Sequence, residues 1–264
     1  MCVKMPIICC SESEVDMANP VLNNKVFDMT FNGCEYEVEK MMSPLGVLNK
    51  TAILGILMSL TFAYTWLLVT GGFSDKAMLL LNIGVLGGLI MSLIIVFAPK
   101  NKFLMLTTSV YAMFEGLALG SISALFNIVY PGIVAQATLG TLITVFGMYV
   151  LYSTKLVQAT DRLIKVVMLA TFGIAGLYIL QFILNIFHIS IPGIFSNSPI
   201  GIFFSVIVVA VAALNLIIDF EFINRYSGEV PSYYEWYSGF SLMVTIVWLY
   251  LEILRLLAKV NSRR

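Results

Sequence analysis

Long apolar runs without charge alternate with short polar links over most of this chain. The longest run, Val166 to Ile218, contains no Asp, Glu, Lys or Arg, and His188 is its only side chain that titrates near neutrality. One membrane crossing needs about 20 apolar residues, so this run is long enough for two. The break is expected at residues 191–193, Ile-Pro-Gly, with Asn197 and Pro199 beyond it, because such residues favour turns.

The same criterion predicts seven transmembrane helices along the chain. Their expected bounds are Thr51–Thr70, Ala77–Ala98, Phe103–Tyr130, Gly132–Thr154, Val166–Phe187, Pro199 to about Phe222, and Trp236 to about Ala258. The links are short, so neighbouring helices should pack antiparallel in one all-α polytopic bundle without a second domain. Small residues one turn apart, Gly84 with Gly88 and Gly116 with Gly120, should let helix backbones approach closely.

Composition agrees with a membrane protein. The chain is 59% hydrophobic and 11% charged, with a mean hydropathy of +0.94, where a soluble domain has roughly 25% charged residues. Its net charge is zero, which gives no basic field for nucleic acid. We interpret residues 1–49 as a cytosolic amino-terminal tail and residues 50–264 as the transmembrane domain. The tail holds all four cysteines, for which neither a disulfide framework nor a metal site is expected: Cys2, Cys9, Cys10 and Cys34.

Basic residues are distributed unevenly between alternate links. Eight lie on the amino-terminal side: Lys40, Lys50, Lys100, Lys102, Lys155, Arg162, Lys165 and Arg225. The opposite links hold only Lys76, so the amino terminus is predicted to be cytoplasmic. The carboxy-terminal Lys259, Arg263 and Arg264 oppose this rule. Either the last helix crosses fully and tolerates them, or it is re-entrant; its length of about 33 Å favours a full crossing.

Three acids lie inside the predicted spans: Glu115, Asp219 and Glu252. A charge at bilayer depth costs roughly 2.5 to 3.5 kcal/mol on insertion scales, so each should face the bundle interior, a partner or a water-filled cavity. Burial also disfavours the charged form of a carboxyl group, which suits a proton sensor or carrier.

Glu115 lies near the middle of its span, which makes it the most costly of the three. We interpret it as a pore acid or an acid that locks helices together. The structural alternative is a protonated side chain bonded to a helix carbonyl or to an amide of Asn82, Gln136 or Gln181.

Asp219 lies near the cytoplasmic end of the sixth span, while Glu221 points away from it around the helix and should be solvated. The structural alternative pairs Asp219 with Arg225 or with a lysine of the link at 155–165. The last span runs antiparallel, so its residues level with Asp219 should be Ser241 to Thr245.

Glu252 and Arg255 are three residues apart and share one face of the last helix, where they form a local pair or a latch. The aromatic residues at the start of this helix are expected in an interfacial belt: Tyr233, Tyr234, Trp236 and Tyr237. No phosphate-binding loop and no HExxH or GxSxG motif is present. We therefore expect neither an enzyme nor a protein that needs a cofactor.

Four stretches resemble the transmembrane Bax inhibitor motif family, in its bacterial branch. They are Leu216–Ile223, Glu235–Leu257, the Phe-Glu-Gly-Leu around Glu115, and Asn-Pro-Val-Leu-Asn from Asn19. The resemblance implies a seven-helix fold with the last helix at its centre. It also implies a pH-sensitive calcium leak channel of the cell membrane, gated by two aspartates on the sixth and seventh helices.

Carried over by residue, Asp219 matches the sixth-helix aspartate. The partner position on the seventh helix falls on Thr245, which is not an acid, and Glu252 lies two turns beyond it; an arginine that some relatives carry in the second span is missing. The resemblance thus assigns the gate to Asp219, with Thr245, Glu252 and Arg255 as candidate partners, and protons and a cation such as calcium as ligands.

Two alternatives remain open. One is a non-conducting interaction protein that modulates membrane proteolysis or the stress response by binding a membrane protease, with residues 1–49 as the contact. The other is a proton-coupled transporter, for which the sequence shows no inverted repeat.

Overall fold

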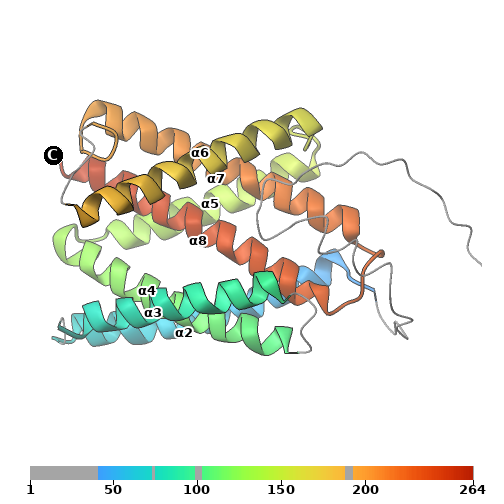
Figure 1. Ribbon diagram of the computed structural model, residues 1–264, viewed down its shortest axis with the longest axis horizontal. Coiled ribbons are helices and arrows are strands. Elements are labelled where there is room, and N and C mark those ends of the chain that lie inside the picture. Colours follow the sequence, from blue (N-terminus) through green and yellow to red (C-terminus); the bar gives the residue numbers. More distant parts are fainter. Residues whose placement is uncertain (1–40, 73–74, 99–102, 188–192, 264) are drawn as a thin grey trace, which may run out of the picture.

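The computed structural model describes residues 41–263 except 73–74, 99–102 and 188–192 (Figure 1). This part of the chain forms seven α-helices: α2 (Pro44–Thr70), α3 (Asp75–Phe97), α4 (Leu104–Val129), α5 (Ile133–Ser153), α6 (Asp161–Ile186), α7 (Pro199–Tyr226) and α8 (Tyr234–Asn261). All seven are long and apolar enough to cross a membrane, which confirms the predicted all-α class. The predicted tail up to residue 40, its cysteines, the predicted turn at Ile191 and Pro192, and His188 lie outside the described residues.

Most helix ends lie within a few residues of their predicted positions. Four helices begin earlier than the charge pattern predicted, and for α2 and α6 the difference exceeds one helical turn. Helix α2 begins at Pro44 because the Ser43 hydroxyl caps it and accepts from the backbone N–H of Gly46 at 3.0 Å. Helix α6 begins at Asp161, where the Thr160 hydroxyl caps it in the same way. A charge-free run marks the part of a helix that lies in lipid and omits the polar first turn, where capping residues and acids are favourable.

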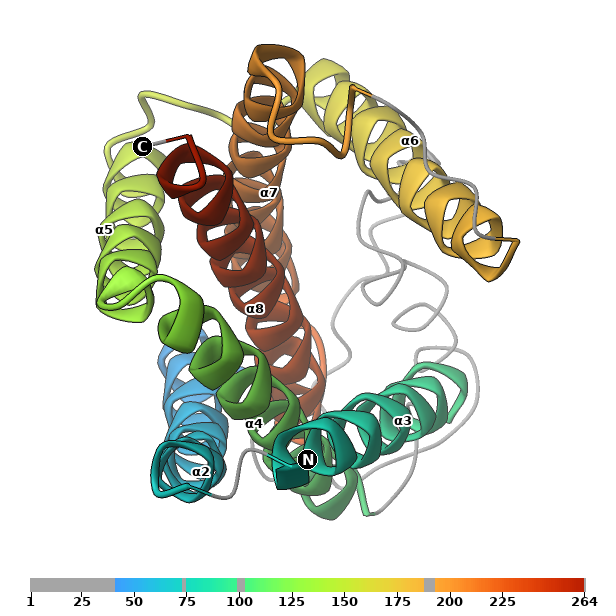
Figure 2. The ribbon, with the colours of Figure 1, turned by 90° about the vertical axis from the view of Figure 1, so that its left-hand side faces the viewer.

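Helix α8 is the centre of the bundle. It packs directly against α2, α4, α5 and α7, while α3 lies on the outer side of α4 and α6 on the outer side of α7 (Figure 2). About 56% of the α8 span is buried inside the protein, against 17% for α2, α3, α5 and α6. The central position that the family resemblance implied for the last helix is therefore present. α8 is one continuous helix of 28 residues, which is long enough for a full crossing.

The start of α8 is an aromatic part of the core. Tyr234, Tyr237 and Phe240 are fully buried, and the Phe240 ring contacts Tyr111 of α4 edge to face at 4.7 Å between centroids. The predicted interfacial belt is wrong for Tyr234, Trp236 and Tyr237, because these rings are buried in one core cluster together with Met42, Val47 and Val230. A belt of tyrosine and tryptophan is expected only where such rings face lipid headgroups.

Glycines set the spacing of α3 and α4, as predicted. A Cβ atom at Gly84 would lie 2.7 Å from the carbonyl oxygen of Phe114, and even closer to the backbone of Ala118. Gly116 and Gly120 approach α2 in the same manner, against Thr61 and Thr65. The two interfaces are thus built on direct contact between backbones.

Candidate functional site

Asp219 of α7 and Thr245 of α8 face each other inside the bundle. The Asp219 side chain is fully buried, with 0% exposure, and Thr245 is also buried. The Thr245 hydroxyl donates to Oδ2 of Asp219 at 2.6 Å. The antiparallel arrangement of the sixth and seventh spans predicted that the residues from Ser241 to Thr245 lie level with Asp219. A short hydrogen bond to a carboxylate is among the stronger polar interactions in proteins, so it joins the two helices at this point.

The neighbouring charges of α7 differ from Asp219 in their surroundings. Arg225, the partner considered in the structural alternative, is exposed near the end of the helix. Glu221 is partly exposed and accepts from the hydroxyl of Tyr152 on α5 at 3.1 Å. Glu221 therefore faces the rim of the bundle, as its predicted separation from Asp219 requires, while Asp219 belongs to the core.

Glu252 forms a second polar cluster further along α8. The Glu252 side chain is 1% exposed and accepts from three residues. Nη1 of Arg255 donates to it at 2.9 and 3.1 Å, the Tyr178 hydroxyl at 2.9 and 3.0 Å, and Nε1 of Trp248 at 3.3 Å. Arg255 also donates to the Tyr178 oxygen at 2.6 Å and lies over the Tyr178 ring. The predicted pair of Glu252 and Arg255 is thus part of a triad whose third residue, Tyr178, lies on α6.

Glu115 lies on a different face of the bundle. Its carboxylate lies next to Gly88 of α3, so a Cβ atom added there would be 3.3 Å from Oε2, and Tyr111 one turn earlier on α4 is its polar neighbour. Of the amides considered as partners, Gln181 lies on α6 and donates to Asn185 at 2.9 Å. Glu115 therefore belongs to the contact between α3 and α4, whereas Asp219 and Glu252 belong to contacts that the central helix α8 makes with α7 and α6.

Two charged residues of the core were not among the predicted site residues. Glu235 in the first turn of α8 is 4% exposed and accepts from the backbone N–H and the hydroxyl of Ser43, both at 3.2 Å. Lys259 in the last turn is 6% exposed, and its ammonium donates to the Gly201 carbonyl at 3.0 Å and to the Ser205 hydroxyl at 2.8 Å. Glu235 precedes the predicted span by one residue, and Lys259 counted only as a tail charge.

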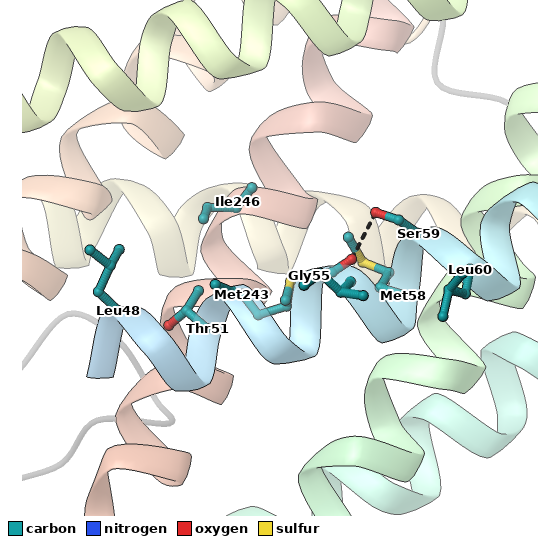
Figure 3. Close-up of a pocket in the computed structure, with 10 residues that line it drawn as sticks. Leu48, Thr51, Gly55, Met58, Ser59, Leu60, Met243 and Ile246 are labelled. Atoms are coloured by element: carbon teal, nitrogen blue, oxygen red, sulfur yellow. Dashed lines mark hydrogen bonds between the residues drawn. The ribbon is translucent and has the colours of Figure 1, made fainter. Parts of the chain in front are cut away.

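A hollow lies between α2 and α8, apart from these polar clusters (Figure 3). Its lining is almost entirely apolar and includes Gly55, Met58, Met243 and Ile246. The Ser59 hydroxyl in its wall is already bonded to the Gly55 carbonyl at 2.7 Å. An apolar hollow that opens beside exposed Ile56 would be covered by acyl chains in a membrane, so it is not a site for an ion.

Comparison with known proteins agrees with this architecture. Residues 19–262 match a family model described as Bax inhibitor 1 like. The match covers nearly the whole chain, so this protein belongs to that family. It does not separate the bacterial branch from the others, and that branch stays a prediction. No match was found among curated proteins. None was found among solved structures either.

Proposed function

We propose that this membrane protein is a pH-sensitive leak pathway for cations such as calcium, with Asp219 as the residue that senses protons. The observation that carries the proposal is the fully buried Asp219 carboxylate, which accepts a 2.6 Å hydrogen bond from Thr245 across α7 and α8. Keeping an acid at such a place is costly, and acids retained inside membrane bundles are commonly found on ion or proton pathways.

The proposed switch depends on the charge of one side chain. While Asp219 is ionised, the bond from Thr245 is charge-assisted and holds α7 against α8. Protonation, or binding of a cation, weakens that bond and shifts the bundle from a closed towards an open arrangement. Leak should therefore increase as the pH falls. In the same proposal, Glu115 attracts the cation or locks α3 to α4, and the pair of Glu252 and Arg255 is a second latch.

The distribution of basic residues supports a particular placement. Eight lysines and arginines in the links on one side, against one in the opposite links, favour a cytoplasmic amino terminus in a cell membrane. In this proposal the ligands are protons and the conducted cation. We propose neither a cofactor nor a catalytic activity for the protein.

Calcium flux into liposomes tests the proposal directly. Purified protein is reconstituted as wild type, as Asp219→Asn and as Glu221→Gln, and flux is followed with an enclosed calcium indicator at acidic, neutral and mildly alkaline pH. Asp219→Asn keeps the shape and removes the titration, so its flux should no longer depend on pH. Glu221→Gln removes a carboxylate two residues away at the rim and should retain the response of the wild type.

Unchanged flux and unchanged pH response in Asp219→Asn would reject the gate. If no variant conducts at all, the buried acids are structural and the protein acts by binding other membrane proteins, for example a membrane protease. Deletion of residues 1–40 is the matched test of that alternative, because the contact with the partner is assigned to this tail. The deletion should abolish a cellular phenotype and leave any flux intact.

A further inference from the structure

We propose that a pocket around Arg255 binds a phosphate group, with a membrane phospholipid as its source. The pocket lies among the carboxy-terminal ends of α4, α6 and α8 and the link before α7, on the opposite side of the bundle from the start of α8. It has a lining of cations, amides, hydroxyls and aromatic rings: Phe126, Tyr130, Tyr178, Gln181, Phe195, Asn197, Arg255, Ala258 and Lys259.

Arg255 supplies the donors. In the described part of the chain this guanidinium hydrogen-bonds through Nη1 alone, to Glu252 and to the Tyr178 oxygen. Its Nε and Nη2 carry three further N–H groups, and 42% of the side chain is accessible. Nε and Nη2 of one guanidinium form a planar fork that matches two oxygens of a phosphate. The bonds of Nη1 fix the plane of this fork.

The balance of charge at the pocket favours an anion. Glu252 is the acid next to it, and that carboxylate is buried and already accepts from Arg255, Tyr178 and Trp248. Lys259 adds a second positive charge, held at the wall by the Ile194 and Gly201 carbonyls and the Ser205 hydroxyl. Two cations against one acid leave a positive site, and the exposed amide of Asn197 at its rim provides a further donor.

The depth of the pocket points to a lipid. Arg255 lies six residues before the end of α8 at Asn261, which is about 9 Å along the helix axis. α8 is about 42 Å long at 1.5 Å per residue, and the hydrocarbon core of a bilayer is about 30 Å thick, so in a helix that crosses centrally Arg255 would lie near the boundary between headgroups and hydrocarbon. The rings of Phe126, Phe195 and Tyr130 form the remaining wall, which suits the first carbons of an acyl chain better than a fully hydrated ion.

Native mass spectrometry of the detergent-solubilised protein tests the proposal, with phosphatidylglycerol as the lipid probe and inorganic phosphate as the soluble probe. Removal of a fork that binds phosphate should lower the affinity roughly tenfold, so Arg255→Gln should lose most of the bound lipid. Arg263→Gln is the matched control. It removes one positive charge from the same end of α8 at an exposed position, and it should bind lipid like the wild type.

Arg255→Lys separates the fork from the charge, since a lysine keeps the charge and loses two-point recognition. Its affinity should lie close to that of Arg255→Gln. Retention of phosphatidylglycerol with loss only in the Arg255 variants supports a lipid source, while protection from thermal unfolding by millimolar inorganic phosphate, lost in the same variants, supports a soluble source. Equal binding by Arg255→Gln and Arg263→Gln, or no binding of either probe by the wild type, would overturn the site.

Discussion

The Ser43 backbone N–H and hydroxyl both donate to Oε1 of Glu235, 192 positions further along the chain and 3.2 Å away. This contact fastens the first turn of α2 to the first turn of α8. The carboxylate also lies against Gly46, so its charge faces the positive end of the α2 helix dipole.

Replacing Glu235 with Ala should therefore destabilise the bundle. Loss of a buried carboxylate that accepts two bonds from the capping residue of α2 is expected to cost roughly 2 kcal/mol. The measurement is the midpoint of thermal unfolding in detergent. Glu229→Ala, at an exposed position in the link before α8, is the control and should unfold like the wild type. Equal midpoints for the two variants would show that the contact with Ser43 contributes nothing to stability.

Thr245→Val tests the donor of the proposed gate without touching its acid. Valine matches the shape of threonine but cannot donate to Asp219, so the leak at neutral pH should rise towards the level that the wild type reaches in acid. Thr245→Ser keeps the hydroxyl and should retain the pH response. Thr141→Val is the matched control, because that hydroxyl donates to the Ala137 carbonyl of its own helix at 2.8 Å. Wild-type flux in Thr245→Val at all pH values would remove Thr245 from the gate.

Tyr178→Phe should loosen α6. Its hydroxyl bonds both Glu252 and Arg255, and in the described residues α6 packs mainly against α7. Loss of this hydroxyl leaves the buried Glu252 with one donor fewer, at a cost of about 1 to 3 kcal/mol. Hydrogen exchange should become faster across Asp161–Ile186 and stay unchanged in α2. Tyr149→Phe, on an exposed tyrosine of α5, should leave exchange in α6 as it is; faster exchange in both variants would argue against a specific tether.

Gly84→Ala should separate α3 from α4. The added methyl group would overlap the backbone of Phe114 and Ala118, which cannot move aside as a flexible side chain can. Overpacking of this kind typically costs about 1 to 3 kcal/mol, visible as a lower midpoint of thermal unfolding. Gly147→Ala is the control, since nothing lies within 4 Å of the new atom. This control should unfold at the same temperature as the wild type or slightly above, because alanine favours helix; a neutral Gly84→Ala would contradict the close packing.

The sequence was sufficient for the seven helices because lipid imposes a strong rule on composition. A charge-free run as long as Val166 to Ile218 is typical of membrane-spanning segments, and the small-residue pairs at Gly84 and Gly116 indicated which faces touch. The register of two antiparallel helices then placed Thr245 level with Asp219, and the structure joins these residues directly.

Other parts of the candidate site depend on which helices are neighbours, and periodicity does not reveal this. Tyr178 lies in the middle of an apolar run, so nothing in the pattern marked it as the partner of Glu252. Lys259 counted as a charge of the tail because its acceptors, the Gly201 carbonyl and Ser205, lie on another helix, and the sequence does not show which helix packs beside the end of α8. Glu235 lies one residue before the predicted span, and nothing in the pattern connects it with Ser43, 192 positions earlier.

The two ends of α8 are held by different parts of the chain, Glu235 by Ser43 and Lys259 by the first turns of α7. Because both of its ends are held, α8 can neither slide along its axis nor tilt freely as a rigid body. What remains is bending or local twisting between the anchors, and Thr245 lies close to the midpoint between these two residues. A change in charge at Asp219 would therefore act near the middle of the central helix, away from the contacts that hold its two ends.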